Sequence, residues 1–329
     1  MQLPSYVWQL QSTNDNGPNV LVLGGTHGDE LPGILAVRQM LHAFGLLQKP
    51  NGNYPNPHIT GNLFLGFGNP QAIVRCTRGV TQRDLNRSFA PEILDDPTVV
   101  QNGQVDAERA QELEPLLQNM DYLLDLHATS GASDPFVAFG NDSERHRDLY
   151  TLMPVQHVLT DPNTILPTMQ NISALGTTDY YVNTFGGSRW SIDKFGKNAT
   201  GVGLCYEAGN QDDASLTALT ISVVLKLLEH IGVVNSEFGD KVLPTRVDYV
   251  VPQQKRYSLK ACIGAKRTKF TYADGMQTNW RPVRKGEILG NYDDGSPEII
   301  AQDGLLVFPK RADKIKEGLS LYLLAEELA

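Results

Sequence analysis

The chain has few cysteines and lacks the start that is typical of a secreted protein. Only Cys76, Cys205 and Cys262 occur among 329 residues, an odd number at wide spacing. Such cysteines do not form the disulfide framework of an extracellular protein and favour reduced thiols. Residues 1–6 also lack the basic start and the apolar core of a signal peptide. We therefore expect a cytoplasmic protein.

An excess of basic charge is absent as well. Asp and Glu number 37 against 28 Lys and Arg, which gives a formal net charge of −9 at pH 7. Such a chain has no basic field to attract nucleic acid or an anionic membrane. No apolar run approaches the roughly 20 residues of a membrane span. We expect neither nucleic acid nor a membrane as a partner, whereas a few local arginines can still hold a small anionic substrate.

Apolar runs alternate with segments of helical spacing over the first part of the chain. Strands are expected at Val20–Leu23, Asn62–Phe67, Tyr122–Leu126, Val155–Leu159 and Gly201–Tyr206. Helices are expected at Leu31–Leu47, Asp106–Met120, Glu144–Leu152 and Ala214–Ile231. Strands that alternate with helices predict an α/β fold with a mixed, mostly parallel sheet that is flanked by helices.

The pattern changes after about residue 244. Short strand-like pieces are separated there by turns such as Asp274-Gly275, Lys285-Gly286 and Asp303-Gly304, which is typical of a small all-β module. Since 329 residues exceed one typical hydrophobic core, two domains are expected. We divide the chain into an α/β domain at 1–243 and a β-rich C-terminal module at 244–329.

A histidine and a glutamate follow the first expected strand. They stand three residues apart in the run Gly24-Gly25-Thr26-His27-Gly28-Asp29-Glu30. A strand that leads into a glycine-rich elbow and then a helix presents side chains at the carboxyl end of a sheet, where open α/β folds bind ligands. An imidazole and a carboxylate in this arrangement can reach one zinc ion if a third ligand arrives from elsewhere.

His127 is the candidate for the third ligand. It follows the apolar strand in Leu123-Leu124-Asp125-Leu126-His127, again at an expected carboxyl end. Two histidines and one glutamate form a typical catalytic zinc set and leave a fourth position for water. Asp125 would share a strand face with His127. Either it orients a ligand, or it is buried against backbone donors.

Glu207 ends another apolar strand, in Gly203-Leu204-Cys205-Tyr206-Glu207. A carboxylate at such a position is costly to desolvate unless it is used or paired, so Glu207 is a candidate for the base that takes a proton from water. The alternative is a charge that reaches solvent where the strand ends. Cys205 lies two residues earlier and must be considered as a nucleophile. Because it sits inside an apolar run, a small buried side chain is the better interpretation.

Four arginines gather between residues 75 and 89 of this acidic chain. They are Arg75, Arg78, Arg83 and Arg87, with Asn86 beside the last. A guanidinium holds a carboxylate through two hydrogen bonds, and an adjacent amide adds direction. The alternative is a solvated basic loop, which we expect to account for one or two of the four.

With these motifs in hand, the chain resembles the aspartoacylase/succinylglutamate desuccinylase family of the zinc carboxypeptidase group. The Gly-Gly-Thr-His-Gly-Asp-Glu, Asp-Leu-Asn-Arg-Ser-Phe and Asp-Leu-His runs are similar to its signature segments and occur in the same order. The resemblance also implies a C-terminal β module that covers the site. It further implies these roles: ligands of one Zn²⁺ per chain at His27, Glu30 and His127, general base and acid at Glu207, carboxylate binding at Asn86 and Arg87, and polarisation of the scissile carbonyl at Arg78.

The resemblance also bears on the substrate. Arg189 is the counterpart that it suggests for an arginine that binds a second carboxylate, while the C-terminal tyrosine of aspartoacylases has no clear match around Pro309–Leu321. The function expected is a zinc-dependent amidohydrolase that cleaves a small N-acyl amino acid or a related carboxylate. The alternatives are a zinc carboxypeptidase for short peptides and a metal-binding protein without turnover. A homo-oligomer is left open.

Overall fold

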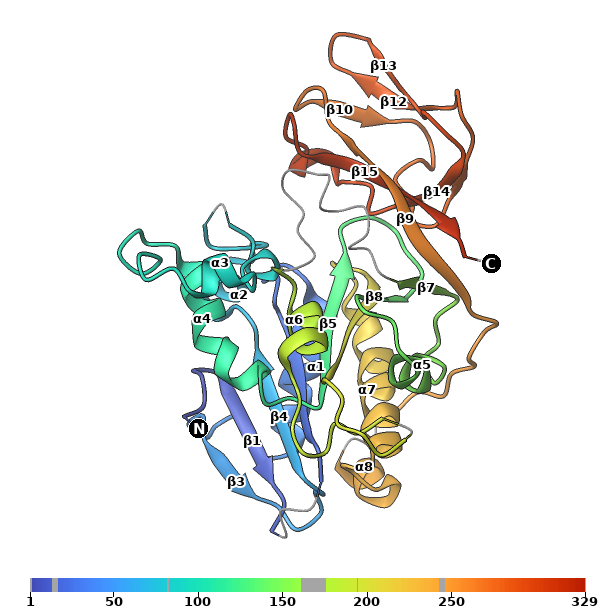
Figure 1. Cartoon of the computed structure of the whole chain (residues 1–329). Helices are drawn as coiled ribbons and strands as arrows, with labels where there is room; N and C mark the ends of the chain where they lie inside the picture. The colour runs from blue at the N-terminus through green and yellow to red at the C-terminus, as the bar shows by residue number, and fades with distance from the viewer. Residues whose placement is uncertain are drawn as a thin grey trace.

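A computed structural model describes residues 2–13, 17–81, 83–160, 176–193, 195–242 and 246–328. Within these residues, twelve strands form one large mixed sheet, and three more form a small sheet near the far end of the molecule (Figure 1). Helices cover both faces of the central strands. The expected fold class, an α/β sheet with a C-terminal β-rich part, is confirmed.

The first part of the chain supplies the helices and the centre of the sheet. Its strands are β1 (Val7–Gln11), β2 (Asn19–Gly24), β3 (Asn53–Pro55), β4 (Asn62–Phe67), β5 (Tyr122–Thr129), β6 (Phe136–Phe139), β7 (His157–Thr160) and β8 (Val202–Asn210). Its helices are α1 (Leu31–Ala43), α2 (Pro70–Arg75), α3 (Pro91–Leu94), α4 (Val105–Leu117), α5 (Glu144–Tyr150), α6 (Thr178–Phe185), α7 (Thr217–Ile231) and α8 (Ser236–Val242), with 3-10 turns at Leu85–Arg87 and Ala214–Leu216. Each expected strand and helix is found; β4 has the expected ends, and the other elements have ends shifted by a few residues.

Strand β2 shows how the alternation of side chains builds two cores. Val20 and Val22 point to a core that includes α1 and α7, whereas Leu21 and Leu23 point to a core that includes α4 and α6. Because successive side chains leave a strand on opposite faces, a central strand must be apolar at every position when helices cover both faces. This requirement explains the continuous apolar run of residues 20–23.

The central strands β5 and β8 are longer than their apolar runs indicate. They pair in parallel, with His127 opposite Glu207, and both residues lie inside their strands instead of just beyond them. The expected ends at Leu126 and Tyr206 were therefore wrong. Backbone pairing continues past the apolar runs because polar side chains are tolerated where the face opens into a site.

The C-terminal strands continue the large sheet. They are β9 (Lys255–Gly264), β10 (Phe270–Tyr272), β11 (Pro282–Val283), β12 (Ile288–Tyr292), β13 (Pro297–Ile299), β14 (Gly304–Val307) and β15 (Ser320–Glu327), with a 3-10 turn at Ala312–Lys314. β9 pairs with β7 in parallel, and β15, β14 and β11 follow it in antiparallel order. Strands β10, β12 and β13 form the small sheet. The interface between the two parts of the chain is apolar, since Phe136 and Leu159 pack with Tyr257, Leu259 and Trp280.

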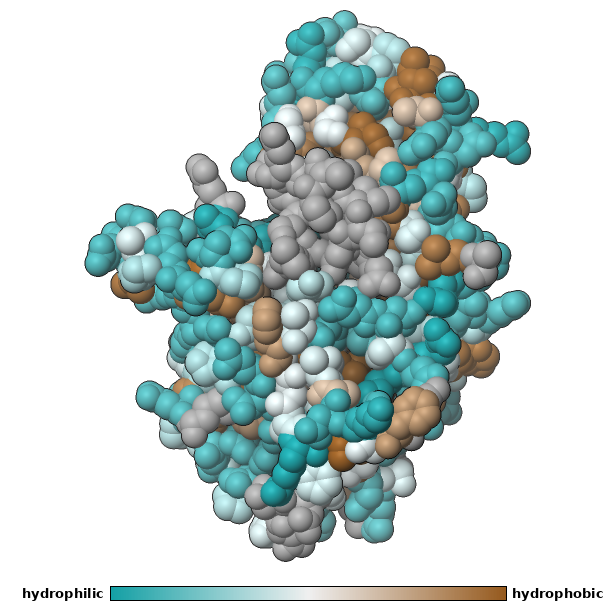
Figure 2. All heavy atoms as spheres, viewed as in Figure 1, coloured by the Kyte–Doolittle hydropathy of each residue, from teal (hydrophilic) through white to brown (hydrophobic). Residues whose placement is uncertain are grey.

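One described segment, Ala214–Ile231, is long and apolar enough to span a membrane by length and composition alone. The expectation that no run approaches such a length therefore has one exception. In this fold the helix α7 packs against α1 and buries Ile221, Val224 and Leu228 in the core. Figure 2 shows a mostly hydrophilic surface on the viewed face, with apolar side chains in small separate groups.

Candidate active site

Three candidate metal ligands converge at one buried point. The Nδ1 atoms of His27 and His127 lie 3.2 Å apart, and the carboxylate of Glu30 lies 2.7 Å from the first and 3.1 Å from the second. All three side chains are buried. Although burial opposes this effect, His27 and His127 hold the pKa of the Glu30 carboxyl below its usual range. The ligands expected from two separate motifs are thus brought together.

The loop between β2 and α1 carries two of these side chains, those of His27 and Glu30. A Cβ on Gly28 would lie 2.1 Å from the carbonyl carbon of Ala72, so only glycine allows the loop to lie against α2 at this point. Glu30 is the N-cap residue of α1, yet its side chain makes no capping hydrogen bond. Instead, Glu30 Oε2 accepts a hydrogen bond from the backbone N–H of Ala128 at 3.0 Å, which fixes the carboxylate beside His127.

Asp125 is buried beneath His127 and has more than one partner. Its oxygens accept hydrogen bonds from the hydroxyls of Thr26 at 2.8 Å and Thr178 at 2.5 Å. Nε2 of His127 lies 3.0 Å from Asp125 Oδ2, but the two atoms are not aligned as a hydrogen bond. Despite the burial of its ring, Asp125 and Glu30 raise the pKa of His127 well above its usual value. Asp125 therefore favours the charged form of the His127 ring, and its hydrogen bonds come from side-chain hydroxyls instead of the backbone donors of the alternative interpretation.

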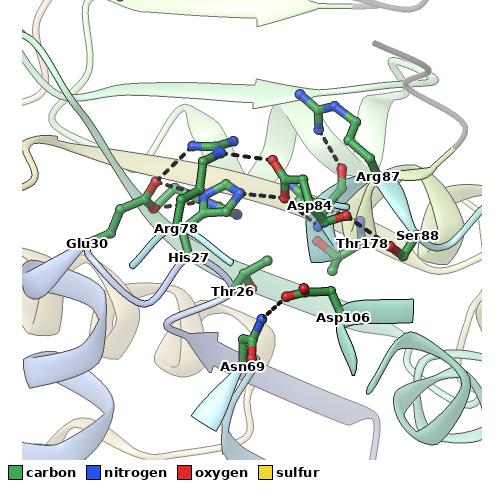
Figure 3. Close-up of polar contacts among 12 residues, drawn as sticks. Thr26, His27, Glu30, Asn69, Arg78, Asp84, Arg87, Ser88, Asp106 and Thr178 are labelled. Carbon is green, nitrogen blue, oxygen red and sulfur yellow. Dashed lines mark hydrogen bonds and ion pairs between the residues drawn. The ribbon is translucent and has the colours of Figure 1, made fainter. Parts of the chain in front are cut away.

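Asp84 joins the first motif to the arginine-rich run, as Figure 3 shows. Its Oδ1 lies 3.0 Å from Nε2 of His27, and its Oδ2 accepts a hydrogen bond from Nε of Arg78 at 2.9 Å. Burial alone would raise the pKa of Asp84, but Arg78 and His27 hold it well below its usual range. Arg78 also lies 3.7 Å from Glu30. The carboxylate thus orients a histidine and an arginine together.

These groups line a cavity together with apolar residues. Its titratable and amide side chains are His27, Glu30, Arg78, Asn86, Arg87, His127, Asp179, Cys205, Glu207 and Lys310. Its apolar walls are made by Ala138, Phe139, Leu159, Leu259, Phe308 and Leu323. A ligand of mixed character, anionic at one end and apolar at another, therefore matches these walls.

Glu207 lies beside the three convergent ligands and is buried. Among the atoms that the structure describes, its Oε2 has no hydrogen-bond partner. Burial raises the pKa of this carboxyl to about 7, in spite of the favourable charge of His127. A carboxyl group with such a pKa can both accept and return a proton near neutral pH.

Cys205 and Asp179 form a buried pair next to Glu207. The thiol lies 3.5 Å from Asp179 Oδ1. Burial, together with the negative charge of Asp179, raises the pKa of the Cys205 thiol well above its usual value. Since a thiolate is the reactive form, this environment favours the interpretation of Cys205 as a small buried side chain.

The four arginines separate into two groups. Arg75 and Arg83 are exposed, as the solvated-loop interpretation expects for one or two of them. Arg78 and Arg87 line the cavity. Asn86 is held beside Arg87 because its Oδ1 accepts a hydrogen bond from the Thr178 backbone N–H at 3.0 Å.

Arg189 does not reach this cavity, which corrects its expected role. It is exposed and its guanidinium lies 5.4 Å from the ring of Trp190. The preceding residue, Ser188, donates hydrogen bonds to Asp121, which directly precedes β5. His127 stands near the other end of that strand, about 20 Å away at the usual rise per residue. The resemblance suggested Arg189 from its position in the sequence, and the fold places it at the opposite edge of the sheet.

Residues 16–231 match the model of the succinylglutamate desuccinylase/aspartoacylase catalytic domain. The chain belongs to this family. The resemblance that the motifs indicated is confirmed.

Relatives of this family member include amidohydrolases. It is 30% identical over 307 residues to the N-acyl-aromatic-L-amino acid amidohydrolase (carboxylate-forming) of Rattus norvegicus, and the match covers 88% of this chain and 84% of that protein. A protein of the same description from Xenopus tropicalis is 32% identical over 129 residues, which is 38% of each chain. The crystal structure of succinylglutamate desuccinylase/aspartoacylase from Rhodobacter sphaeroides superposes with a TM-score of 0.67 at 19% identity, covering 98% of this chain and 89% of that one.

Several residues of the cavity region carry no role assigned from the sequence, among them Asp84 and Lys310. Asp84 belongs to the Asp-Leu-Asn-Arg run, and its place just before Asn86 was the signal that could have indicated a role. Lys310 follows β14 in the C-terminal part, and no local pattern marks it. It enters the cavity only because the C-terminal strands pack beside β7.

Proposed function

We propose that this protein is a zinc-dependent amidohydrolase that cleaves N-acyl amino acids to a carboxylate and a free amino acid. The observation that carries the proposal is the convergence of His27, Glu30 and His127 in the same cavity as the buried Glu207 carboxyl. The amidohydrolase names of the relatives support the reaction class.

The donor set fits a zinc ion. Tetrahedral ligands at about 2.0–2.1 Å from zinc lie about 3.3 Å from one another, and the two Nδ1 atoms of His27 and His127 are 3.2 Å apart. Two imidazoles and one carboxylate suit zinc better than magnesium or calcium, which prefer oxygen. When bound to such a set, zinc polarises a carbonyl and lowers the pKa of water.

Glu207 would accept and then donate a proton during the reaction. In the attacking step, its carboxylate accepts a proton from water at Oε2 while the new bond forms between the water oxygen and the amide carbon. As the carbon–nitrogen bond breaks, the carboxyl returns that proton to the leaving nitrogen. A group whose pKa is about 7 suits both transfers, since general catalysis works best near the operating pH.

The cationic residues that line the cavity would bind the substrate. Arg87 and the Asn86 amide would bind the amino-acid carboxylate, and Arg78, which lines the same cavity, would stabilise charge on the carbonyl oxygen. The apolar residues of the lining, which include Phe139 and Leu259, suit an apolar acyl group or side chain. Relatives named for N-acyl-aromatic amino acids support this preference.

Two other functions remain to be separated from this one. A zinc carboxypeptidase would cleave short peptides faster than any N-acyl amino acid, and a metal-binding protein would hold zinc without turnover. The test combines metal analysis of the purified protein with amine release from a panel of N-acetyl amino acids and dipeptides. We expect about one zinc ion per chain and fastest cleavage of an N-acetyl amino acid. Protein that neither contains nor takes up zinc would contradict the proposal.

A further inference from the structure

A segment of the C-terminal part, residues 308–314, closes one side of the cavity; we call it the cover segment. Two of its side chains, Phe308 and Lys310, line the cavity directly. The segment connects β14 to β15, and the backbone N–H of Lys310 donates a hydrogen bond to the Leu321 carbonyl at 2.8 Å. It is therefore anchored to the sheet at the point where Lys310 enters the cavity.

Ion pairs hold the other end of the cover segment to the loops of the site. Lys314 pairs with Asp29, the residue that directly precedes the ligand Glu30. Arg311 pairs with Asp212 at 3.0 Å, in the loop that follows β8 and Glu207. The segment thus contacts both loops that flank the candidate ligands and base.

Phe308 adopts a backbone conformation that is costly for its type. Its φ is 51°, in the left-handed region that bulky residues rarely occupy. Its backbone N–H donates a hydrogen bond to Asn279 Oδ1 at 2.5 Å, and its ring packs 5.5 Å from that of Phe136. Strained residues of this kind persist where the surrounding contacts over-determine them, and they cluster at functional sites. Lys310, two residues later, lines the cavity.

The Lys310 ammonium lies among charges that do not neutralise it. No hydrogen bond or ion pair of this ammonium occurs within the described parts of the chain. Burial and the nearby guanidinium of Arg78 lower its pKa to about 8, against the opposite effect of Asp84, and Arg87 acts in the same direction as Arg78. Asp84 is already engaged with Arg78 and His27. Lys310 is half-buried, and a partly desolvated cation without an ion-pair partner gains from an anionic ligand.

We propose that Lys310 binds a carboxylate of the substrate and is a specificity-determining residue contributed by the C-terminal part. The inference rests on the proposed function, since it needs an anionic N-acyl amino acid in the cavity. Its carboxylate is either the α-carboxylate, shared with Arg87, or a second one on the side chain or acyl group. In both cases the anion would contact the cover segment and the first part of the chain at once.

The test measures binding without turnover. In an E207Q background, calorimetry gives the dissociation constants of N-acetyl-L-phenylalanine, its amide and N-acetyl-L-glutamate for chains with Lys310, K310M or K310R. K316M is the matched control, because Lys316 lies in the same connection and is exposed. We expect K310M to weaken binding of at least one carboxylate ligand about ten-fold or more, while binding of the amide changes less than about three-fold. K310R should restore most of the loss.

The ligands distinguish the source of the carboxylate. A loss with N-acetylphenylalanine assigns Lys310 to the α-carboxylate, and a loss confined to N-acetylglutamate assigns it to a second carboxylate. Equal losses for the acid and its amide, or no loss, would overturn the proposal for Lys310. Turnover by the chain with Glu207 intact is measured in parallel. If that chain hydrolyses none of the compounds, the proposed function fails, whereas turnover with no K310M effect on binding rejects only the role of Lys310.

Discussion

His27 and Asp84 lie 57 positions apart in the sequence, and Nε2 of His27 stands 3.0 Å from Oδ1 of Asp84. The other ring nitrogen, Nδ1, faces Glu30 and His127. One histidine thus connects the candidate metal ligands with the loop that carries Arg78. A carboxylate at this position fixes the tautomer of a ligating imidazole and its orientation, so a candidate metal ligand and the arginine are oriented by a shared group.

Removal of one candidate ligand should abolish metal retention. We expect His127→Ala to reduce the zinc content from about one per chain to a small fraction, because two protein ligands hold zinc far more weakly than three. The content is measured by atomic emission after dialysis. His42→Ala is the matched control, since His42 is exposed on α1. Unchanged zinc in His127→Ala would remove this residue from the ligand set.

Loss of the Glu207 carboxylate should separate binding from turnover. We expect Glu207→Gln to keep its zinc and its substrate affinity but to lower kcat by about 10²–10⁴-fold, the usual effect of removing a general base. Glu92→Gln, on an exposed surface, serves as the control. Steady-state kinetics with N-acetylphenylalanine provide the measurement, and full activity of Glu207→Gln would exclude Glu207 from proton transfer.

Substitution of Arg87 and substitution of Arg189 should have different effects on KM. Arg87 lines the cavity, so Arg87→Ala should raise KM about ten-fold or more through the loss of a charged hydrogen bond to carboxylate. Arg189→Ala should leave KM within about two-fold, because this side chain lies at the opposite edge of the sheet. A large KM effect at Arg189 with none at Arg87 would reverse our assignment.

Asp106 should control the stability of the loop that carries Arg78. Its buried carboxylate accepts hydrogen bonds from the backbone N–H groups of Val80 and Thr81, the Thr81 hydroxyl and the Asn69 amide. Asp106→Ala leaves these donors without a charged acceptor, and we expect the free energy of unfolding to fall by about 3 kcal/mol. Urea denaturation measures the change. Glu108→Ala, exposed on the same helix, should alter it by less than about 0.5 kcal/mol.

Alkaline pH should lower kcat/KM for carboxylate substrates. The pKa of Lys310 is lowered to about 8, so its ammonium is charged below that pH and becomes neutral above it. The charges around it are those of Arg78, Asp84, Arg87 and Lys314, and the arginines stay protonated throughout. We therefore expect kcat/KM for a carboxylate substrate whose binding depends on Lys310 to fall as the pH rises through about 8, and this fall should disappear in K310R. A profile that is the same in both proteins would contradict a charged contact.

The local sequence pattern was sufficient to single out the candidate site residues that follow apolar runs. His27, His127 and Glu207 each follow such a run, and the carboxyl ends of neighbouring parallel strands meet at one edge of a sheet. The lengths of β5 and β8 could not be read in the same way, because the polar side chains that line the cavity interrupt the apolar pattern while backbone pairing continues.

The other features of the site depend on contacts between distant parts of the chain, which the sequence pattern does not reveal. Lys314 and Asp29 are separated by 285 positions, and no propensity or spacing links them. Phe308 has a left-handed backbone that sequence preference argues against. Arg189 shows the converse case, in which an order of motifs along the chain suggested a contact that the fold does not make.

The parallel pairing of β7 with β9 has a consequence for how the protein is made. All four residues of β7 are buried, and its outer backbone groups pair with Lys255, Arg256 and Tyr257. Until β9 has been synthesised, this edge presents unpaired N–H and C=O groups beside an apolar surface, which is a template for pairing with another chain. A truncated chain that ends near residue 243 should therefore aggregate even though every candidate zinc ligand is present.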